Sequence, residues 1–248
     1  MEHYGKLSEA DKELASELKR VLLIGTQIWP KGTSQMRWQY KFLVLLAAGL
    51  IASGLLLLIL SEFRGELTQP RLSTLDQRGM NAAHAWTAPG LTNAMQVCTF
   101  IGGWAFITTF VALVALLMFL RGAKRDAGVL AIAVGGSAAL NVGLKLFFHR
   151  TRPSVAWALG HEQSFSFPSG HAVAAFCFYA TIAYLLARGR RAMTRTILIT
   201  ISVCIVFAVG LSRVYLGVHY PSDIAAGYLV GALWVSSLIL ALRYAEHR

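Results

Sequence analysis

Six long apolar stretches limit the fold of this 248-residue chain more than any other feature of its sequence. A helix needs about 20 apolar residues to cross the roughly 30 Å hydrocarbon core of a bilayer. The stretches come close to that length or exceed it, so we expect an all-α polytopic membrane protein with a six-transmembrane-helix bundle. They cover residues 42–60, 95–120, 127–148, 171–187, 196–216 and 221–242.

The composition supports a membrane protein rather than a soluble one. Hydrophobic residues make up 56% of the chain and charged residues only 14%, whereas about a quarter of the residues in a soluble domain are charged. The formal net charge of +11 would suit nucleic acid, but much of the excess Lys and Arg lies between apolar stretches, where it sets topology. We therefore expect the lipid bilayer as the surroundings and no nucleic-acid partner.

Basic residues gather in the segments on one side of the predicted bundle. Six spans place both termini on that side, and the positive-inside rule makes it cytoplasmic. The opposite, outer side receives residues 61–92, 149–170 and 217–220. The basic residues are Lys31, Arg37, Lys41, Arg121, Lys124, Arg125, Arg188, Arg190, Arg191, Arg195, Arg243 and Arg248.

Residues 1–40 predict a cytoplasmic amphipathic segment ahead of the first span. Within them, apolar residues recur at steps of three and four over 8–24, which is one face of a helix. This helix would lie on the membrane or on the domain, and a solvated helix with no docking surface is the alternative. We expect the transmembrane domain at 41–243 and a cytoplasmic tail at 244–248.

Glycine and proline residues mark a helix end, an interruption and close packing in the predicted helices. Residues 72–86 predict a short interfacial helix on the outer side that ends near Pro89 and Gly90. Gly102 and Gly103 interrupt the second apolar stretch. Small residues in the third and sixth stretches suit helix packing inside one bundle better than dimerisation, and the oligomeric state stays open. They are Gly135, Gly136, Ser137, Gly227 and Gly231.

Three short strings of polar residues lie at the outer ends of the third to sixth stretches. A charge at such a depth is costly unless it has a partner, so these residues indicate a functional site. The strings are Lys145…Arg152-Pro153, then Pro168-Ser169-Gly170-His171, then Ser212-Arg213…His219…Asp223.

The cations of these strings suit an oxyanion such as a phosphate. Arg152 and Arg213 would bind it as planar forks and Lys145 as a point charge. Ser169 and the backbone N–H of Gly170 open a helix, whose N-terminus attracts anions because its first N–H groups have no partners. We expect these five residues to form a phosphate-binding cradle.

The two histidines suit nucleophilic and acid catalysis. His219 and Asp223 are four residues apart, so the carboxylate can hold one imidazole nitrogen and leave the other as a nucleophile. His171, across the site, would protonate the leaving oxygen as a general acid. The three residues would therefore act as a catalytic set.

Some of these polar residues could have other roles. Two histidines and an aspartate could bind a metal, but three nearby cations would repel it, so no metal or other cofactor is expected. We expect His149 and His161 to be surface histidines, and Arg150 to add charge at the rim or anchor at the headgroups. Arg213 as a plain snorkelling cation is the alternative to phosphate binding.

At these three strings the chain resembles the type 2 phosphatidic acid phosphatase superfamily, with every spacing met. The resemblance covers about residues 90–243. It implies a six-helix membrane phosphatase that needs no metal, in which His219 becomes phosphohistidine, Asp223 orients it and His171 protonates the leaving group. The residues that it implies for holding the phosphoryl oxygens are Lys145, Arg152, Ser169, Gly170 and Arg213.

The predicted topology narrows the substrate to a lipid whose phosphate lies at the periplasmic face of a bacterial inner membrane, and the resemblance supplies the candidates. Undecaprenyl diphosphate and phosphatidylglycerol phosphate are favoured, with phosphatidic acid and lipid A phosphates as further family substrates. A lipid phosphotransferase is the alternative within the family. An anion or lipid transporter is the alternative of another class, although broken helices near the midplane would then be expected. Soluble vanadium-dependent haloperoxidases share the motif but not the six spans.

Overall fold

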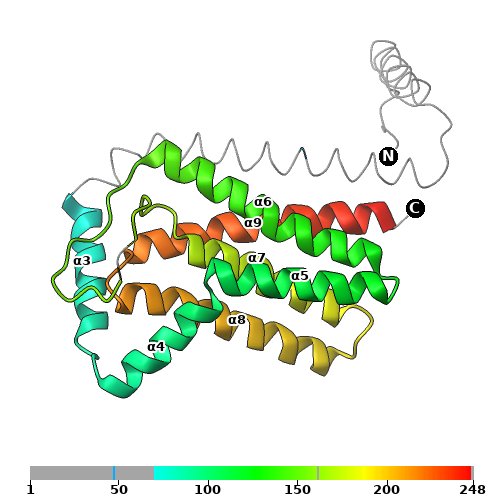
Figure 1. Cartoon of the computed structure of the whole chain (residues 1–248), viewed down its shortest axis with the longest axis horizontal. Coiled ribbons are helices and arrows are strands. Elements are labelled where there is room, and N and C mark those ends of the chain that lie inside the picture. Colours follow the sequence, from blue (N-terminus) through cyan, green and yellow to red (C-terminus); the bar gives the residue numbers. More distant parts are fainter. Residues whose placement is uncertain (1–46, 48–69, 161, 247–248) are drawn as a thin grey trace, which may run out of the picture.

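The structure is a computed structural model that describes residues 47, 70–160 and 162–246. The amphipathic segment at 1–40 and the first span at 42–60, apart from one residue, lie outside the described residues. The regular structure in the described ranges is helical (Figure 1), so the all-α prediction is confirmed for that part of the chain. The helices are α3 (Pro70–His84), α4 (Pro89–Ile101), α5 (Trp104–Leu120), α6 (Lys124–Phe148), α7 (Gly170–Ala187), α8 (Ala192–Tyr215) and α9 (Pro221–Glu246).

Four helices, α6 to α9, are long and apolar enough to cross a membrane. The pair α4 and α5 passes the same test together, although the two helices are bent by 49° at their junction, which brings the number to as many as five. A multi-pass membrane fold is therefore confirmed. The total of six remains a prediction, because the first expected span is not described.

Two glycines, as the sequence predicted, lie at the break between α4 and α5. A Cβ at Gly102 would lie 2.2 Å from Cγ1 of Val209, so only glycine lets α8 pass this close. Gly103 follows in extended geometry and opens α5. Pro89 follows the end of α3, as expected, and it also opens α4, where a proline needs no backbone hydrogen-bond partner.

Helix α7 forms the centre of the bundle and packs against α5, α6, α8 and α9. Its residues from Ala172 to Ala175 have no exposed surface. A Cβ at Gly227 would lie 2.8 Å from Cβ of Ala172, and one at Gly231 would lie 2.9 Å from Phe176, so glycines in α9 permit the approach. The close packing inside one bundle that these glycines predicted is therefore present.

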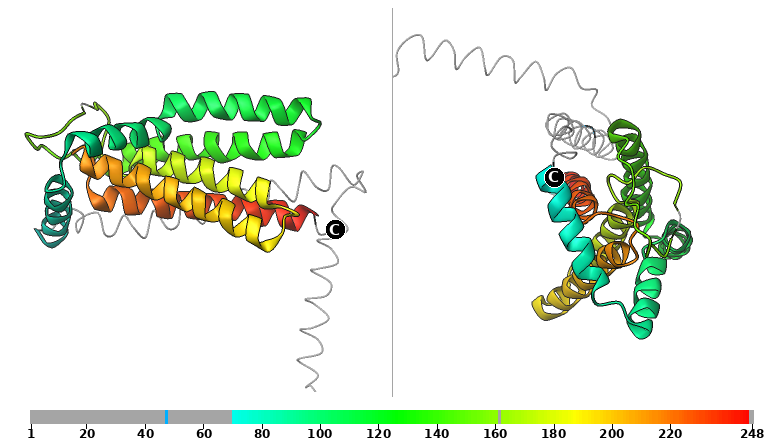
Figure 2. Two further views of the ribbon diagram at one scale, coloured as in Figure 1. Left: turned by 90° about the horizontal axis from the view of Figure 1, so that it is seen from below. Right: turned by 90° about the vertical axis from the view of Figure 1, so that its left-hand side faces the viewer.

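Helix α3 crosses one end of the bundle. It runs across the axes of the long helices in Figure 1, and the right-hand view of Figure 2 looks onto the bundle from that end. It packs against α8 and α9, with Met80 and Asp76 buried. The helix predicted at 72–86 is thus present, and its place at the outer membrane surface remains a prediction.

Candidate functional site

The three polar strings meet at the end of the bundle that α3 crosses. Helix α6 stops at Phe148 because His149 adopts a left-handed conformation, with φ 51°, and turns the chain out of the helix. A second turn joins α8 to α9 at Gly217, whose φ is +73°. A hydrogen bond of 3.0 Å from the Leu159 N–H to the Leu216 carbonyl ties the loop after α6 to this turn.

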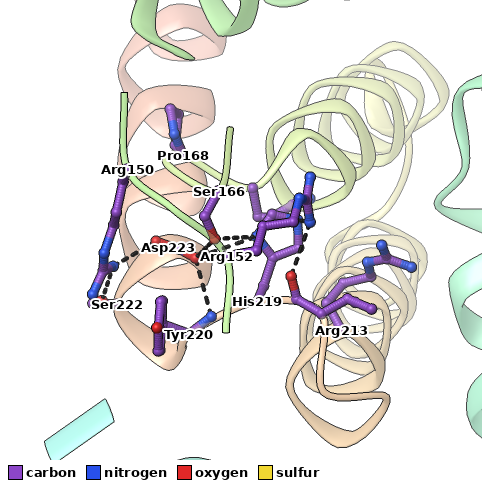
Figure 3. Close-up of polar contacts among 12 residues, drawn as sticks. Arg150, Arg152, Ser166, Pro168, Arg213, His219, Tyr220, Ser222 and Asp223 are labelled. Atoms are coloured by element: carbon purple, nitrogen blue, oxygen red, sulfur yellow. Dashed lines mark hydrogen bonds and ion pairs between the residues drawn. The ribbon is translucent and has the colours of Figure 1, made fainter. Parts of the chain in front are cut away.

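His219 lies between Asp223 and Arg152 (Figure 3). Its Nδ1 is 3.3 Å from Oδ2 of Asp223, as the four-residue spacing predicted. Its Nε2 is 3.0 Å from Nη1 of Arg152, which also donates to the Val218 carbonyl at 2.8 Å. A guanidinium can only donate, so Nε2 carries the lone pair and Nδ1 the proton.

Burial keeps the His219 imidazole neutral. Only 1% of its surface is exposed, and burial lowers its pKa to about 4, although the hydrogen bond and charge of Asp223 oppose this shift. The positive charges of Arg152 and Arg213 lower the pKa further. A neutral imidazole at neutral pH has the lone pair that a nucleophile needs.

Asp223 is held on both of its oxygens. Oδ2 accepts from the Tyr220 N–H at 3.0 Å and from Oγ of Ser166 at 2.5 Å, and it faces His219. Oδ1 accepts from Nη1 of Arg150 at 2.6 Å. The carboxylate has no exposed surface, so these contacts fix its orientation.

Glu162 occupies the cationic cradle. Its carboxylate forms ion pairs with Arg152, at 2.7 Å, and with Arg213. Burial alone would raise the pKa of Glu162, but the two guanidinium groups outweigh burial and lower it. Lys145 lies beside the same loop and donates to the Phe165 carbonyl. A carboxylate therefore sits where the sequence predicts a phosphoryl group.

Arg213 retains capacity for a further acceptor. It is buried, donates to Oγ1 of Thr99 at 2.5 Å and pairs with Glu162, so the snorkelling interpretation is wrong. Among the described residues, nothing accepts a hydrogen bond from its buried Nε. A buried donor without a partner is costly, and an anion bound beside it would relieve that cost.

The N-terminus of α7 lies against Asp223. Ser169 caps the helix and its N–H donates to the backbone carbonyl of Asp223 at 3.1 Å. A Cβ at Gly170 would lie 3.1 Å from Oδ1 of Asn141 and 3.2 Å from Nε1 of Trp104, so this position leaves little space for a side chain. The predicted Ser169 and Gly170 therefore sit at the site, next to the backbone of the first turn of α9.

His171 follows in the first turn of α7. Its Nε2 lies 3.7 Å from the position a Cβ would take at Gly103, so it faces the break between α4 and α5. Its ring is within electrostatic reach of Arg213, Glu162 and His219. The structure thus brings all eight predicted site residues to one end of the bundle: Lys145, Arg152, Ser169, Gly170, His171, Arg213, His219 and Asp223.

Four polar residues at the site were not predicted from the sequence. Arg150 was expected at the rim or the headgroups, and this is wrong: it pairs with Asp223 and, at 2.7 Å, with Asp76 on α3. Ser166 and Glu162 lie between two of the strings. A carboxylate in a basic loop, such as Glu162, was the available signal, whereas Asp76 is too distant in sequence to be linked to the site.

The structure also bears on His149 and on the metal alternative. His149 is exposed, as expected, and His161 lies outside the described residues. Within residues 70–160 and 162–246, no group of three or more His, Cys, Asp or Glu side chains is arranged to hold a metal. The charges around Asp223 are guanidinium groups instead.

Comparison with known proteins identifies relatives of the same architecture. The model of the PAP2 superfamily matches residues 126–246, which contain all eight predicted site residues. Phosphatidylglycerophosphatase B of Bacillus subtilis is 34% identical over 164 residues, which cover 65% of this chain and 80% of the relative. The putative undecaprenyl-diphosphatase YbjG of Escherichia coli is 33% identical over 134 residues, covering 51% of this chain and 64% of the relative.

A solved structure shares the fold. The crystal structure of a transmembrane PAP2-type phosphatidylglycerolphosphate phosphatase from Bacillus subtilis superposes with a TM-score of 0.69 at 31% identity, covering 79% of this chain and 96% of that one. The fold and these relatives define a multi-pass, all-helical membrane protein. The chain belongs to the PAP2 superfamily.

Proposed function

We propose that this protein is a membrane lipid phosphatase that works through a phosphohistidine at His219. The observation that carries the proposal is the position of His219, with Nδ1 facing Asp223 and Nε2 facing the guanidinium of Arg152. The relatives are named as phosphatases of phosphatidylglycerophosphate and of undecaprenyl diphosphate, which supports a lipid phosphate as the substrate class.

The first chemical step forms the bond between Nε2 of His219 and phosphorus and breaks the bond between phosphorus and the lipid oxygen. Asp223 accepts the hydrogen bond from Nδ1–H and stabilises the positive ring that develops. The phosphoryl oxygens displace Glu162 from Arg152 and Arg213 and lie near Lys145. His171 gives a proton to the leaving oxygen, which departs as a lipid alcohol or a lipid monophosphate.

The second step reverses these roles. Water attacks phosphorus opposite Nε2, and His171, now neutral, takes the proton of the water. The phosphorus–nitrogen bond breaks, phosphate leaves, and His219 returns to its neutral form. Ser169 and the N–H of Gly170, at the positive end of α7, hold phosphoryl oxygens throughout. No metal ion is required, because fixed cations supply the charge stabilisation.

The site belongs to the outer surface of a bacterial inner membrane in this proposal. Arg121, Lys124 and Arg188 lie at the ends of the long helices that are far from the site. These basic residues favour a cytoplasmic location for their end of the bundle. We place both termini, the amphipathic segment 1–40 and the tail 244–248 on the cytoplasmic side of the domain 41–243. A lipid of the outer leaflet would then present its phosphate at headgroup depth.

Phosphate release by the purified protein tests the function. The panel contains phosphatidylglycerol phosphate, undecaprenyl diphosphate and phosphatidic acid, each presented alone in detergent, with and without EDTA. We expect release of inorganic phosphate that is insensitive to EDTA and absent in a folded His219→Ala variant. No release from any single lipid would favour a phosphotransferase that needs a second lipid, and normal release by His219→Ala would refute the nucleophile.

A further inference from the structure

A buried aspartate of α3 lies behind the site. Asp76 is 2% exposed, and its Oδ1 accepts a hydrogen bond from the Ser222 N–H at 3.0 Å. Its Oδ2 accepts from Oγ of Ser222 at 2.6 Å and from Nη2 of Arg150 at 2.7 Å. Asp76 therefore lies at the N-terminus of α9, where the helix dipole favours a negative charge.

Arg150 joins this aspartate to Asp223. Its Nη1 donates to Oδ1 of Asp223 at 2.6 Å, and the guanidinium lies 4.3 Å from the centre of the Tyr220 ring. Burial alone would lower the pKa of Arg150, but Asp223 and Asp76 outweigh it and raise the pKa. Its Nη1 also donates to Oγ of Ser222 at 2.7 Å, so contacts with two carboxylates and a hydroxyl fix the guanidinium beside Asp223 (Figure 3).

Helix α3 can reach this position because of a glycine. A Cβ at Gly79 would lie 2.7 Å from Cγ of Pro221, the first residue of α9. Asp76 is one turn earlier on the same helix, and so lies against the same end of α9. The contact between α3 and α9 therefore brings the Asp76 carboxylate within reach of Ser222 and Arg150.

We propose that Asp76 and Arg150 are positioning residues that hold Asp223, and through it His219, in the reactive orientation, so that α3 completes the active site. This inference rests on the proposed role of His219. Oδ1 of Asp223 is fixed by Arg150, which leaves Oδ2 for the imidazole. A misplacement of about 1 Å at a reacting group can cost roughly 100-fold in rate.

The arrangement also sets the charge that His219 feels. The negative charge of Asp76 offsets the positive charge of Arg150, so the pair is close to neutral beside Asp223. Removing Asp76 alone leaves a net positive charge beside Asp223, and removing Arg150 alone leaves a net negative charge. Removing both leaves no net charge there. The other charged or titratable groups that face His219 and Asp223 are Lys145, Arg152, Glu162, His171, Arg213 and Tyr220.

The pH dependence of kcat/KM separates charge from geometry. In Arg150→Gln the uncompensated Asp76 stabilises the imidazolium, so the acid limb should move to higher pH by about one unit. In Asp76→Asn the uncompensated Arg150 destabilises it, so the limb should stay or move to lower pH. In the double variant the limb should return toward its wild-type position, while kcat stays low because Arg150 no longer holds Oδ1 of Asp223.

The experiment compares these variants with Asp126→Asn, which breaks the ion pair with Arg188 at the other end of α6 and should leave kcat unchanged. We expect kcat to fall roughly 10-fold to 100-fold in Asp76→Asn, with KM and the inhibition constant of orthovanadate within about threefold of wild type. Unfolding midpoints in detergent report the fold. If Arg150→Gln does not fold, Arg150→Lys keeps the charge and should lower kcat without moving the limb.

The outcomes distinguish this inference from the proposed function. Wild-type kcat in a folded Asp76→Asn variant, beside an inactive His219→Ala, would overturn the positioning role alone. A lower kcat that comes together with weaker vanadate binding and a lower unfolding midpoint would also overturn the positioning role. Asp76 would then act only as a cap that stabilises α9. An active His219→Ala would overturn the proposed function itself.

Discussion

His219 carries its reactivity because it is buried between a carboxylate and a guanidinium. Its pKa is lowered to about 4, mainly by burial, so the imidazole stays neutral above that pH and is protonated below it. We predict that the acid limb of kcat/KM, which reports protonation of His219, lies near pH 4 to 5 and not near 6.5, the ordinary pKa of histidine. An acid limb near pH 6.5 in the pH–rate profile would contradict this assignment.

Glu162 is an anion of the protein itself that occupies the phosphate-binding arginines. Because it pairs with both Arg152 and Arg213, a phosphoryl group must displace it. We predict that Glu162→Gln binds orthovanadate at least about fivefold more tightly, which corresponds to roughly 1 kcal/mol. Competitive inhibition measures this. Weaker vanadate binding in the variant would show that Glu162 organises the two arginines instead of competing for them.

Neighbouring glycines in α6 differ only in what they face. A Cβ at Gly136 would lie 2.2 Å from Cζ2 of the buried Trp234, whereas a Cβ at Gly135 meets nothing within 4 Å. We predict that Gly136→Ala lowers the free energy of unfolding by about 1–3 kcal/mol, from overpacking. Gly135→Ala should be neutral or stabilise by up to about 1 kcal/mol. Thermal unfolding in detergent compares the matched pair, and equal effects would contradict the packing of α6 on α9.

The sequence predicts elements well where one local property decides them. The length of apolar stretches predicts α6 to α9, because a span needs only enough apolar residues. Gly102 and Gly103 predict the interruption of the second stretch, but not its 49° angle, which no local pattern encodes, nor the close approach of Gly102 to Val209 of α8.

The same distinction holds for the site. His219 and Asp223 are four residues apart, so their pairing follows from local spacing. The link from Asp76 through Arg150 to Asp223 joins residues from three distant segments, and no periodicity in the sequence connects them. For this reason, the sequence does not predict Asp76 or the contacts of Arg150 with Asp76 and Asp223.

At the scale of the whole molecule, the bundle has a polar site at one end and basic turns at the other. We predict that a membrane-impermeant maleimide labels Leu159→Cys, an exposed position in the loop at the site, from the outside of intact spheroplasts. Arg190→Cys, in the turn between α7 and α8, should react only after permeabilisation. The test uses a background with Cys98, Cys177 and Cys204 replaced, and the reverse pattern would place the site in the cytoplasm.

The covalent intermediate is the central claim, and the stereochemical course at phosphorus tests it most directly. A lipid thiophosphate that is made chiral at phosphorus with one 18O is hydrolysed by the purified protein in 17O-labelled water, and the configuration of the released thiophosphate, which carries 16O, 17O, 18O and sulfur, is determined. Two successive in-line displacements, first by His219 and then by water, predict retention of configuration. Inversion would mean that water attacks the lipid phosphate directly, and would contradict a phosphohistidine at His219.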